Sequence, residues 1–340
     1  MISLGKKILV LDGAMGTMIQ KYNLTEEDYR GEAFCGCEKE LKGNNECLNL
    51  THPEIIKAIH KEYIDAGADI IETNTFSANR ISQAEYGCEG YAEVMAFEGA
   101  RIAREVADET AAEGRKVWVA GSVGPTSKSL SLSPDVSDPA FRVYSFEAMR
   151  EAYREQIDGL VRGGVDMILV ETCFDALNVK AALAGMDHDI PVMVSVSVGD
   201  RSGRTLTGQT LEAFYTSVKH HNLLTFGLNC SLGAAELTPL VEDLNSWCTC
   251  GVSCYPNAGL PNEMGGYDQS PAEMAVQVKE MASRGLINIV GGCCGTTPDH
   301  IKAIAEAVSG IAPRLSSGNQ AILPDCKLTV SGLEAIIIDK

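Results

Sequence analysis

The chain has 340 residues, of which 45% are hydrophobic and 22% are charged, and its 28 Lys and Arg against 46 Asp and Glu give a formal net charge of −18. This length accommodates one α/β barrel of about 250 residues with an appendage, or two ordinary domains. The composition excludes disordered and fibrous proteins, and the acidic balance disfavours nucleic acid and anionic membranes as partners.

No secretory signal is readable near the start, because Asp12 interrupts the apolar run Ile8–Leu11 after four residues. No run of about 18 apolar residues, the length that a membrane-spanning helix needs, occurs in the sequence. We therefore expect a cytoplasmic protein with no membrane partner. In that compartment the 12 cysteines are expected to be buried thiols, nucleophiles or metal ligands rather than disulfides.

Short β-branched apolar runs recur along the chain, and each is followed by a turn and a segment of helical periodicity. They predict eight strands, at Ile8–Leu11, Ile70–Thr73, Val117–Gly121, Met167–Val170, Val192–Val196, Thr225–Leu228, Val252–Tyr255 and Ile287–Gly291. The predicted helices include Pro53–Ala66, Ala92–Ala111, Phe146–Val161 and Ala272–Ser283. Helix starts are indicated at Thr51–Glu54 and Ser270–Glu273, where a hydroxyl residue precedes a proline and a glutamate.

Alternation of strands and helices requires parallel strands joined by crossovers, and eight such units predict a (β/α)8 barrel, the TIM-barrel fold of the α/β class. The alternative is an open doubly wound sheet. It is disfavoured because the turn Asp12–Thr17 lacks the G-x-G-x-x-G spacing of a dinucleotide site. The barrel is expected to span residues 1–310, and residues 311–340, which lose the alternation, are expected to form a linker.

Polar residues gather at the ends of the predicted strands, which is where the active site of such a barrel lies. In chain order they are Asp12, then Glu72, Thr73 and Asn74, then Ser122, then Glu171, Thr172 and Cys173, then Ser195, then Asn229 and Cys230, then Asn257, then Cys293 and Cys294.

The adjacent Cys293 and Cys294 are flanked by glycines, which tolerate the backbone bend that turns both sulfurs toward one point. The helix start at Thr297 follows, and a helix amino end stabilises thiolates. Cys230 ends the sixth strand, one strand away from the eighth. Three thiolates around one ion match zinc, which in catalytic sites keeps a fourth position open. The alternative is that Cys293 and Cys294 are merely small buried residues at a tight turn.

The other cysteines are expected to be structural. Cys248, Cys250 and Cys254 enter from the amino end of the seventh strand, which predicts packing in the barrel core or floor. Cys35, Cys37 and Cys47 lie in the long first crossover. They could hold a second metal, but no fourth ligand is evident.

Glu171 and Asp12 each end an apolar strand, so each carboxylate is expected to be partly buried and to need a partner. The partner could be a lysine or arginine of the protein, or the ammonium group of a ligand. Neither turn has an adjacent basic residue, which favours the ligand. Asp175 is predicted to cap the helix that follows Glu171.

The segments that carry this chemistry together resemble the homocysteine S-methyltransferase family, over about residues 5–310; they are Asp12–Thr17, Glu72–Phe76, Gly121–Pro125, Glu171–Thr172, Leu228–Cys230, Tyr255–Gly259 and Gly291–Thr296. The resemblance implies a zinc-bearing barrel in which Cys230, Cys293 and Cys294 are the metal ligands and the sulfur of homocysteine is the fourth. It also implies that Glu171 and Asp12 hold the substrate ammonium, with Gly13, Ser122, Asn229 and Asn257 nearby.

Within the family, Leu41–Asn45 and Glu72–Thr75 resemble the homocysteine module of cobalamin-dependent methionine synthases. The tail Leu328–Ala335, which contains Ser331–Glu334, is similar to the segment that leads into the folate module of those enzymes. This resemblance implies that homocysteine receives its methyl group from methylcobalamin carried by another module. Cobalamin-binding and folate-binding modules are then the expected partners.

Three alternatives remain. The donor could be betaine or S-methylmethionine, since the zinc site alone does not choose among donors. The chain could be a zinc or thiol redox sensor, although a sensor would not need the carboxylates Glu171 and Asp12. A barrel lyase with a Schiff-base lysine is disfavoured, because no predicted strand ends in lysine.

Overall fold

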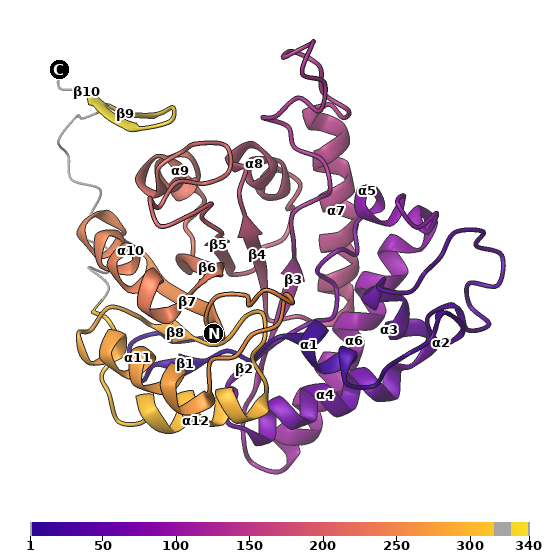
Figure 1. Cartoon of the computed structure of the whole chain (residues 1–340), viewed down its shortest axis with the longest axis horizontal. Coiled ribbons are helices and arrows are strands. Elements are labelled where there is room, and N and C mark those ends of the chain that lie inside the picture. Colours follow the sequence, from indigo (N-terminus) through magenta and orange to yellow (C-terminus); the bar gives the residue numbers. More distant parts are fainter. Residues whose placement is uncertain (1, 316–327, 339–340) are drawn as a thin grey trace.

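The computed structural model describes residues 2–315 and 328–338. Eight parallel strands form the centre of the molecule, and helices surround them (Figure 1). The strands are β1 (Leu9–Val10), β2 (Ile70–Glu72), β3 (Trp118–Val123), β4 (Met167–Cys173), β5 (Val192–Val196), β6 (Thr225–Gly233), β7 (Gly251–Asn257) and β8 (Ile289–Val290). This arrangement confirms the predicted (β/α)8 barrel and all eight predicted strands.

The barrel closes between its first two strands. Neighbouring strands pair in the order β1-β8-β7-β6-β5-β4-β3-β2, and a parallel bridge between Leu11 and Ile70 joins the two ends of this series. The amide of Asp12 donates to the carbonyl of Ile70 at 3.0 Å. The carboxyl ends of all eight strands therefore surround one opening, and the residues that follow them come close together.

The longer helices are the crossovers that the strand–helix alternation predicted. They are α4 (Pro53–Asp65), α6 (Ala92–Ala112), α7 (Phe146–Gly163), α8 (Ala176–Ala184), α9 (Leu211–Val218), α10 (Ala234–Trp247), α11 (Pro271–Ser283) and α12 (Pro298–Val308). Shorter helices are α1 (Met15–Gln20), α2 (Glu26–Arg30), α3 (Leu48–Thr51) and α5 (Arg80–Gln83), with 3₁₀ turns at Asn45–Cys47, Glu89–Tyr91 and Lys219–His221. Across the described residues, no helix combines the length and the apolar character that crossing a membrane requires.

Two of the three predicted helix caps are confirmed. Ser270 and Glu273 form a capping box at the start of α11, and the side chain of Asp175 caps α8 by accepting from the amide of Leu177 at 2.9 Å. The predicted cap at Thr51 is wrong. Thr51 is the last residue of α3, and its hydroxyl donates to the carbonyl of Cys47 at 3.3 Å, so it is not available to α4.

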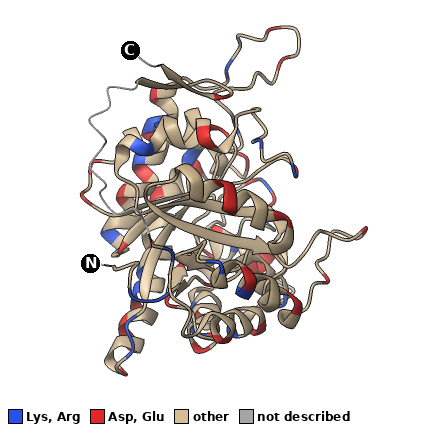
Figure 2. Cartoon of the chain, turned by 90° about the vertical axis from the view of Figure 1, so that its left-hand side faces the viewer, with Lys and Arg blue, Asp and Glu red and all other residues tan. Residues whose placement is uncertain are grey.

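Side chains fill the barrel from its amino end to its middle. Leu9, Leu11, Ile70, Met167, Leu169, Met193, Tyr255 and Ile289 form one buried cluster, and a larger apolar layer lies between the strands and the helices. Lysine, arginine and acidic residues lie mainly on the outer helices and loops (Figure 2). The polar residues at the strand ends therefore face the opening at the carboxyl end of the barrel.

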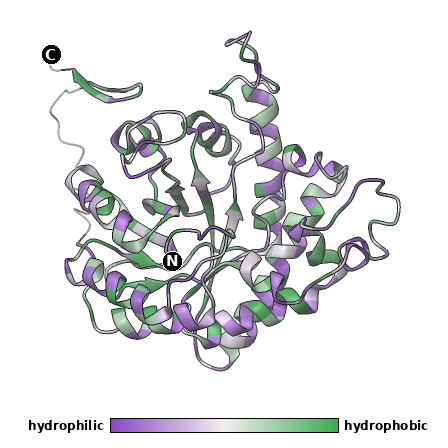
Figure 3. Ribbon diagram, viewed as in Figure 1, coloured by the Kyte–Doolittle hydropathy of each residue, from purple (hydrophilic) through white to green (hydrophobic). Residues whose placement is uncertain are grey.

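The described part of the tail, which we expected to be a linker, forms an antiparallel hairpin of β9 (Leu328–Ser331) and β10 (Ala335–Ile338). The hairpin lies against α9. The amide of Thr210 donates to the carbonyl of Leu333 at 2.9 Å, and the hydroxyl of Ser331 donates to the carbonyl of Ala213 at 2.6 Å. Most of it is hydrophobic (Figure 3). Residues 316–327 and 339–340 of the expected linker lie outside the described residues.

Candidate active site

Three cysteines converge at the carboxyl end of the barrel. The Sγ atom of Cys294 lies 3.8 Å from that of Cys230 and 4.0 Å from that of Cys293, and all three sulfurs lie within 4.8 Å of one another. A tetrahedral zinc site with Zn–S bonds of about 2.3 Å separates its sulfurs by about 3.8 Å. Both the chemistry and the spacing of these donors therefore fit zinc. In the described part of the chain, this is the one group of three or more His, Cys, Asp and Glu side chains close enough to hold a metal ion.

The local backbone turns Cys230 toward the other two sulfurs. Cys230 and Ser231 both have a φ of 62°, a left-handed conformation that residues other than glycine rarely adopt. The pairing of β6 with β7 shifts register between Asn229 and Gly233, so the strand bulges here. The hydroxyl of Ser231 lies 2.6 Å from that of Ser197, which ties the bulge to the loop after β5.

The turn that carries Cys293 and Cys294 is fastened to the end of β7. The amide of Cys293 donates to the carbonyl of Pro256 at 2.8 Å, and the amide of Cys294 donates to Oδ1 of Asn257 at 3.1 Å. Gly295 follows with a φ of 79°. A side chain at Gly295 would collide with the ring of Tyr267, so this bend requires glycine.

The three thiols also favour a negative charge among themselves. Hydrogen bonds from Cys230 and Cys293 lower the pKa of Cys294 to about 3. Helix α12 begins at Pro298, just after this turn, and its amino end adds a positive potential. The site is therefore prepared to hold a cation.

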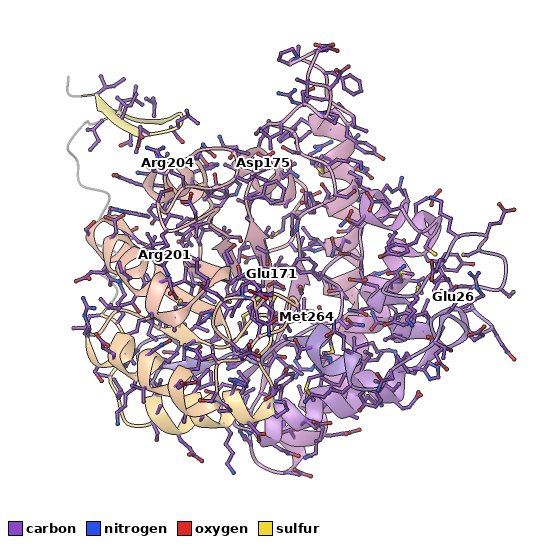
Figure 4. The ribbon with its side chains drawn as sticks, in the orientation of Figure 1. Glu26, Glu171, Asp175, Arg201, Arg204 and Met264 are labelled. Atoms are coloured by element: carbon purple, nitrogen blue, oxygen red, sulfur yellow. The ribbon has the colours of Figure 1, made fainter. Side chains whose placement is uncertain are left out.

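Asp12 and Glu171 lie at the same end of the barrel, as predicted, but they are more deeply buried than expected, with only 2% and 4% of their surfaces exposed. Burial raises the pKa of Asp12 well above its usual range and that of Glu171 to about 7, and no lysine or arginine contributes to either shift. The hydroxyl of Ser122 donates to Oε1 of Glu171 at 2.5 Å. One oxygen of Asp12, Oδ1, has no hydrogen-bond partner among the described residues. Figure 4 shows Glu171 near the centre of the barrel.

Asn229 and Asn257 have protein partners for their polar atoms. Oδ1 of Asn229 accepts from the amide of Thr172 at 3.0 Å and from the hydroxyl of Ser195 at 2.7 Å, and its Nδ2 donates to Oγ1 of Thr172 at 2.8 Å. Asn257 holds the amide of Cys294. Asn257 thus shapes the chain at Cys294, and Asn229 shapes the chain beside Glu171.

Gly13 lies where the turn after β1 meets the turn after β8. A Cβ atom at Gly13 would lie 2.8 Å from Oγ1 of Thr296 and 2.8 Å from the ring of Tyr63. That hydroxyl of Thr296 lies 3.1 Å from the amide of Ala14, which donates to it. The close approach therefore excludes any larger residue at position 13.

Two residues of this region received no role from the sequence. Glu72 ends β2 with its carboxyl group beside Glu171 and Asp12, and burial and these two acids raise its pKa. Tyr255 lies on β7, and its buried hydroxyl has no hydrogen-bond partner among the described residues. The position of Glu72 at a strand end, equivalent to that of Glu171, is a signal that could have identified it. Tyr255 lies within an apolar run, so the sequence predicts only a core residue at this position.

Three further cysteines, Cys248, Cys250 and Cys254, lie before or on β7. Cys248 and Cys254 are buried, as expected for packing residues. Sγ of Cys248 lies 3.6 Å from that of Cys250, and Arg314 donates to the carbonyls of both. In the first crossover, Sγ of Cys37 lies 3.6 Å from that of Cys88, a neighbour that the sequence did not reveal.

Comparisons with known proteins are consistent with this geometry. Residues 9–308 match the profile of the family described as homocysteine S-methyltransferase. The oxidized form of the homocysteine methyltransferase MmuM from Escherichia coli is 22% identical, with a TM-score of 0.69 over 88% of this chain and 95% of that chain. Its metallated form matches with the same identity and TM-score over 88% and 96% of the two chains. At this identity, the structural likeness supports the fold.

Proposed function

The chain belongs to the homocysteine S-methyltransferase family, and from this premise we propose that it transfers a methyl group to the sulfur of homocysteine, giving methionine, at a zinc ion held by Cys230, Cys293 and Cys294. The observation that carries the proposal is the convergence of three thiols, 3.8 and 4.0 Å apart, at the barrel end that also holds Asp12 and Glu171. A sulfur-binding group and an ammonium-binding group in one opening fit an amino acid thiol.

Zinc suits the chemistry that this reaction needs. A free thiol has a pKa of about 8.5 and is mostly protonated at neutral pH, whereas methyl transfer requires a thiolate. Bound zinc would supply that thiolate by lowering the pKa of the substrate thiol. A metallated form of the E. coli homocysteine methyltransferase exists, which supports a metal in this family.

The residues of the chain orient the substrate. Glu171 and Asp12 would accept hydrogen bonds from its ammonium group, and Ser122 would fix Glu171 by the hydrogen bond to Oε1. The unpartnered Oδ1 of Asp12 is available for the same group. Holding the amino acid at its ammonium end directs its thiol toward the three cysteines, and such positioning contributes up to roughly 7–11 kcal/mol in favourable reactions.

We infer that the donor is methylcobalamin, carried by another module of a methionine synthase. The support is the resemblance of Leu41–Asn45 and of Ser331–Glu334 to segments of those enzymes. Nδ2 of Asn74 donates to the carbonyl of Asn45 at 2.8 Å, so the first crossover adjoins the loop that follows β2. In the reaction, homocysteine sulfur supplies the electron pair of the new S–C bond, and the donor leaves with the pair of the bond that breaks. Residues 311–340 would lead toward a folate-binding module.

A comparison of donors tests this function. The zinc-loaded chain is incubated with L-homocysteine and methylcobalamin, S-methylmethionine or betaine, and methionine is quantified. We expect slow formation of methionine from methylcobalamin, in an amount equal to the cofactor demethylated. Methionine from S-methylmethionine or betaine alone would assign a different donor. No methionine from any of the three donors would contradict the transferase function and favour the zinc or thiol sensor.

A further inference from the structure

Beyond the end of β2, the chain supports β3 with two threonine side chains in place of its backbone. The last pair of the ladder is Glu72 opposite Ala120, and the amide of Thr73 still donates to the carbonyl of Ala120 at 3.0 Å. In a continued parallel ladder, the carbonyl of Thr73 and the amide of Thr75 would bond to Ser122. Here these two groups bond to each other, at 2.9 Å. The backbone groups of Ser122 therefore need other partners on this side.

The hydroxyls of the same two threonines are those partners. The amide of Ser122 donates to Oγ1 of Thr73 at 3.0 Å, and the hydroxyl of Thr75 donates to the carbonyl of Ser122 at 2.8 Å. The two hydroxyl oxygens lie 2.6 Å apart. Because Thr75 has already used its one hydroxyl hydrogen, Thr73 must be the donor between them. The three hydrogen bonds thus run in one direction and form a ring that the backbone of Ser122 closes.

Packing fixes this hydrogen-bonded ring. Thr73, Thr75 and Ser122 are all buried. Gly99 of α6 lies so close to Thr75 that a Cβ atom at position 99 would be 2.5 Å from Cγ2 of Thr75, so the methyl group lies toward α6 and the hydroxyl faces Ser122. Gln156 of α7 donates to the carbonyls of Thr75 and Ser122, at 2.7 and 3.3 Å. Loss of either threonine hydroxyl would therefore disturb a buried network that holds Ser122.

The side chain of Ser122 connects the ring to the candidate substrate site. Its hydroxyl donates to Oε1 of Glu171 at 2.5 Å, and Glu171 is the carboxylate that we propose for the ammonium group. Holding the amide and the carbonyl of Ser122 fixes the direction in which its side chain leaves the strand. A carboxylate that is fixed before the ligand arrives loses less conformational freedom on binding, which favours affinity.

We propose that Thr73 and Thr75 are positioning residues, which hold the backbone of Ser122 so that its hydroxyl presents Glu171 to the ammonium group of the substrate. The two threonines act through Ser122 and not on the ligand. This inference rests on the proposed function, because it takes homocysteine as the ligand.

Valine substitutions test the ring, because valine keeps the shape of threonine and removes the hydroxyl. Thr73→Val and Thr75→Val each interrupt the ring, and Thr75→Ser keeps it. Thr110→Val is the matched control, since the hydroxyl of Thr110 is buried in α6 and donates to the carbonyl of Val106 at 2.9 Å. Dissociation constants of the zinc-loaded proteins are measured by calorimetry for L-homocysteine and for 4-mercaptobutyrate, which has the thiol and the carboxylate but no ammonium. The zinc content of each variant is determined in parallel.

We expect Thr73→Val and Thr75→Val to weaken homocysteine binding by about 5- to 50-fold, because a loosened Glu171 loses part of its hydrogen bond to a charged group. Thr75→Ser should stay within about threefold of the wild type. Thr110→Val should bind homocysteine as the wild type does. The affinity for 4-mercaptobutyrate and the zinc content should be unchanged in all four variants, which a misfolded protein would not show.

A double-mutant cycle tests the route through Ser122. Ser122→Ala removes the hydroxyl that reaches Glu171 and should itself weaken homocysteine binding. In that background Thr75→Val should cost no further affinity, because the ring then has no hydroxyl to position. An equal loss in both backgrounds would show that Thr75 acts by another route, and the inference would be wrong.

The other outcomes separate the inference from the function on which it rests. The inference also fails if the valine variants, or Ser122→Ala by itself, bind homocysteine as the wild type does. It fails too if the valine variants lose homocysteine and 4-mercaptobutyrate equally, since the ring would then support the fold or the metal site rather than the ammonium site. If the wild type binds neither thiol, the proposed function itself fails.

Discussion

The side chain of Asn229 holds the backbone of Thr172 in a left-handed conformation. Thr172 has a φ of 54°, and its amide and hydroxyl both bond to Asn229, at 3.0 and 2.8 Å. A β-branched residue in this region is rare, and such a conformation costs about 1–3 kcal/mol. Because Thr172 follows Glu171 directly, the end of β6 fixes the direction in which β4 presents its carboxylate.

Removing this clamp should affect both stability and binding. Asn229→Ala leaves the amide of Thr172 without its partner, so we expect the free energy of unfolding to fall by about 1–3 kcal/mol in urea titrations. Homocysteine binding should weaken as well, because Glu171 loses its fixed direction. Asn245→Ala is the control, since Asn245 also bonds two segments but lies near Leu286 and Arg314. It should cost stability alone; equal homocysteine affinity in the two variants would contradict the positioning role of Asn229.

The three sulfurs should be individually necessary for zinc. Serine at Cys230, Cys293 or Cys294 replaces a soft thiolate by a poor ligand, and we expect each variant to lose most of its metal and its methyl transfer. Zinc per chain is measured after dialysis against a weak chelator. Cys254→Ala is the control, because Cys254 is fully buried away from the site and should affect stability alone. Full zinc occupancy in all three serine variants would refute the assignment of ligands.

Asp12 should contribute to recognition of the ammonium group through its free oxygen. Asp12→Asn keeps an acceptor for the amide of Glu72 but presents an amide N–H where Oδ1 stands, and it removes the charge. We expect the affinity for L-homocysteine to fall about 10- to 100-fold, with little change for 4-mercaptobutyrate. Parallel losses for both ligands, in titrations of the zinc-loaded protein, would show that Asp12 does not contact the ammonium.

His60 should make the fold sensitive to acid. It is fully buried in α4, neither of its ring nitrogens bonds to a described residue, and burial lowers its pKa from 6.5 to about 4. Between these values the unfolded chain binds a proton that the folded chain does not, so stability falls as the pH drops through this window. The loss at pH 5 relative to pH 8 should be about 2 kcal/mol from this residue.

His60→Leu isolates this contribution. Urea titrations at pH 5 and pH 8 should give a smaller difference in unfolding free energy for the variant than for the wild type. Residual acid sensitivity is expected from other groups. An unchanged difference would mean that His60 is not held neutral in the folded chain.

The sequence was sufficient for the barrel and for the convergence of Cys230, Cys293 and Cys294, because both depend on local patterns. The apolar runs predict the strands, and a cysteine at a strand end lies at the opening of the barrel wherever the strand occurs. The role of Thr172 could not be predicted in this way. The left-handed bend at Thr172 depends on Asn229, a residue of another strand. The same holds for the approach of Cys88 to Cys37, which are 51 residues apart.

The claim that the three cysteines hold zinc for a homocysteine sulfur is tested most directly by X-ray absorption at the zinc edge. Spectra of the zinc-loaded chain are recorded with and without L-homocysteine, and the sulfur neighbours at about 2.3 Å are counted. We expect three sulfurs in the free protein and four with homocysteine, whereas L-methionine, which has no thiol, should leave the count at three. A count that stays at three when homocysteine is bound would show that its sulfur does not bind the zinc.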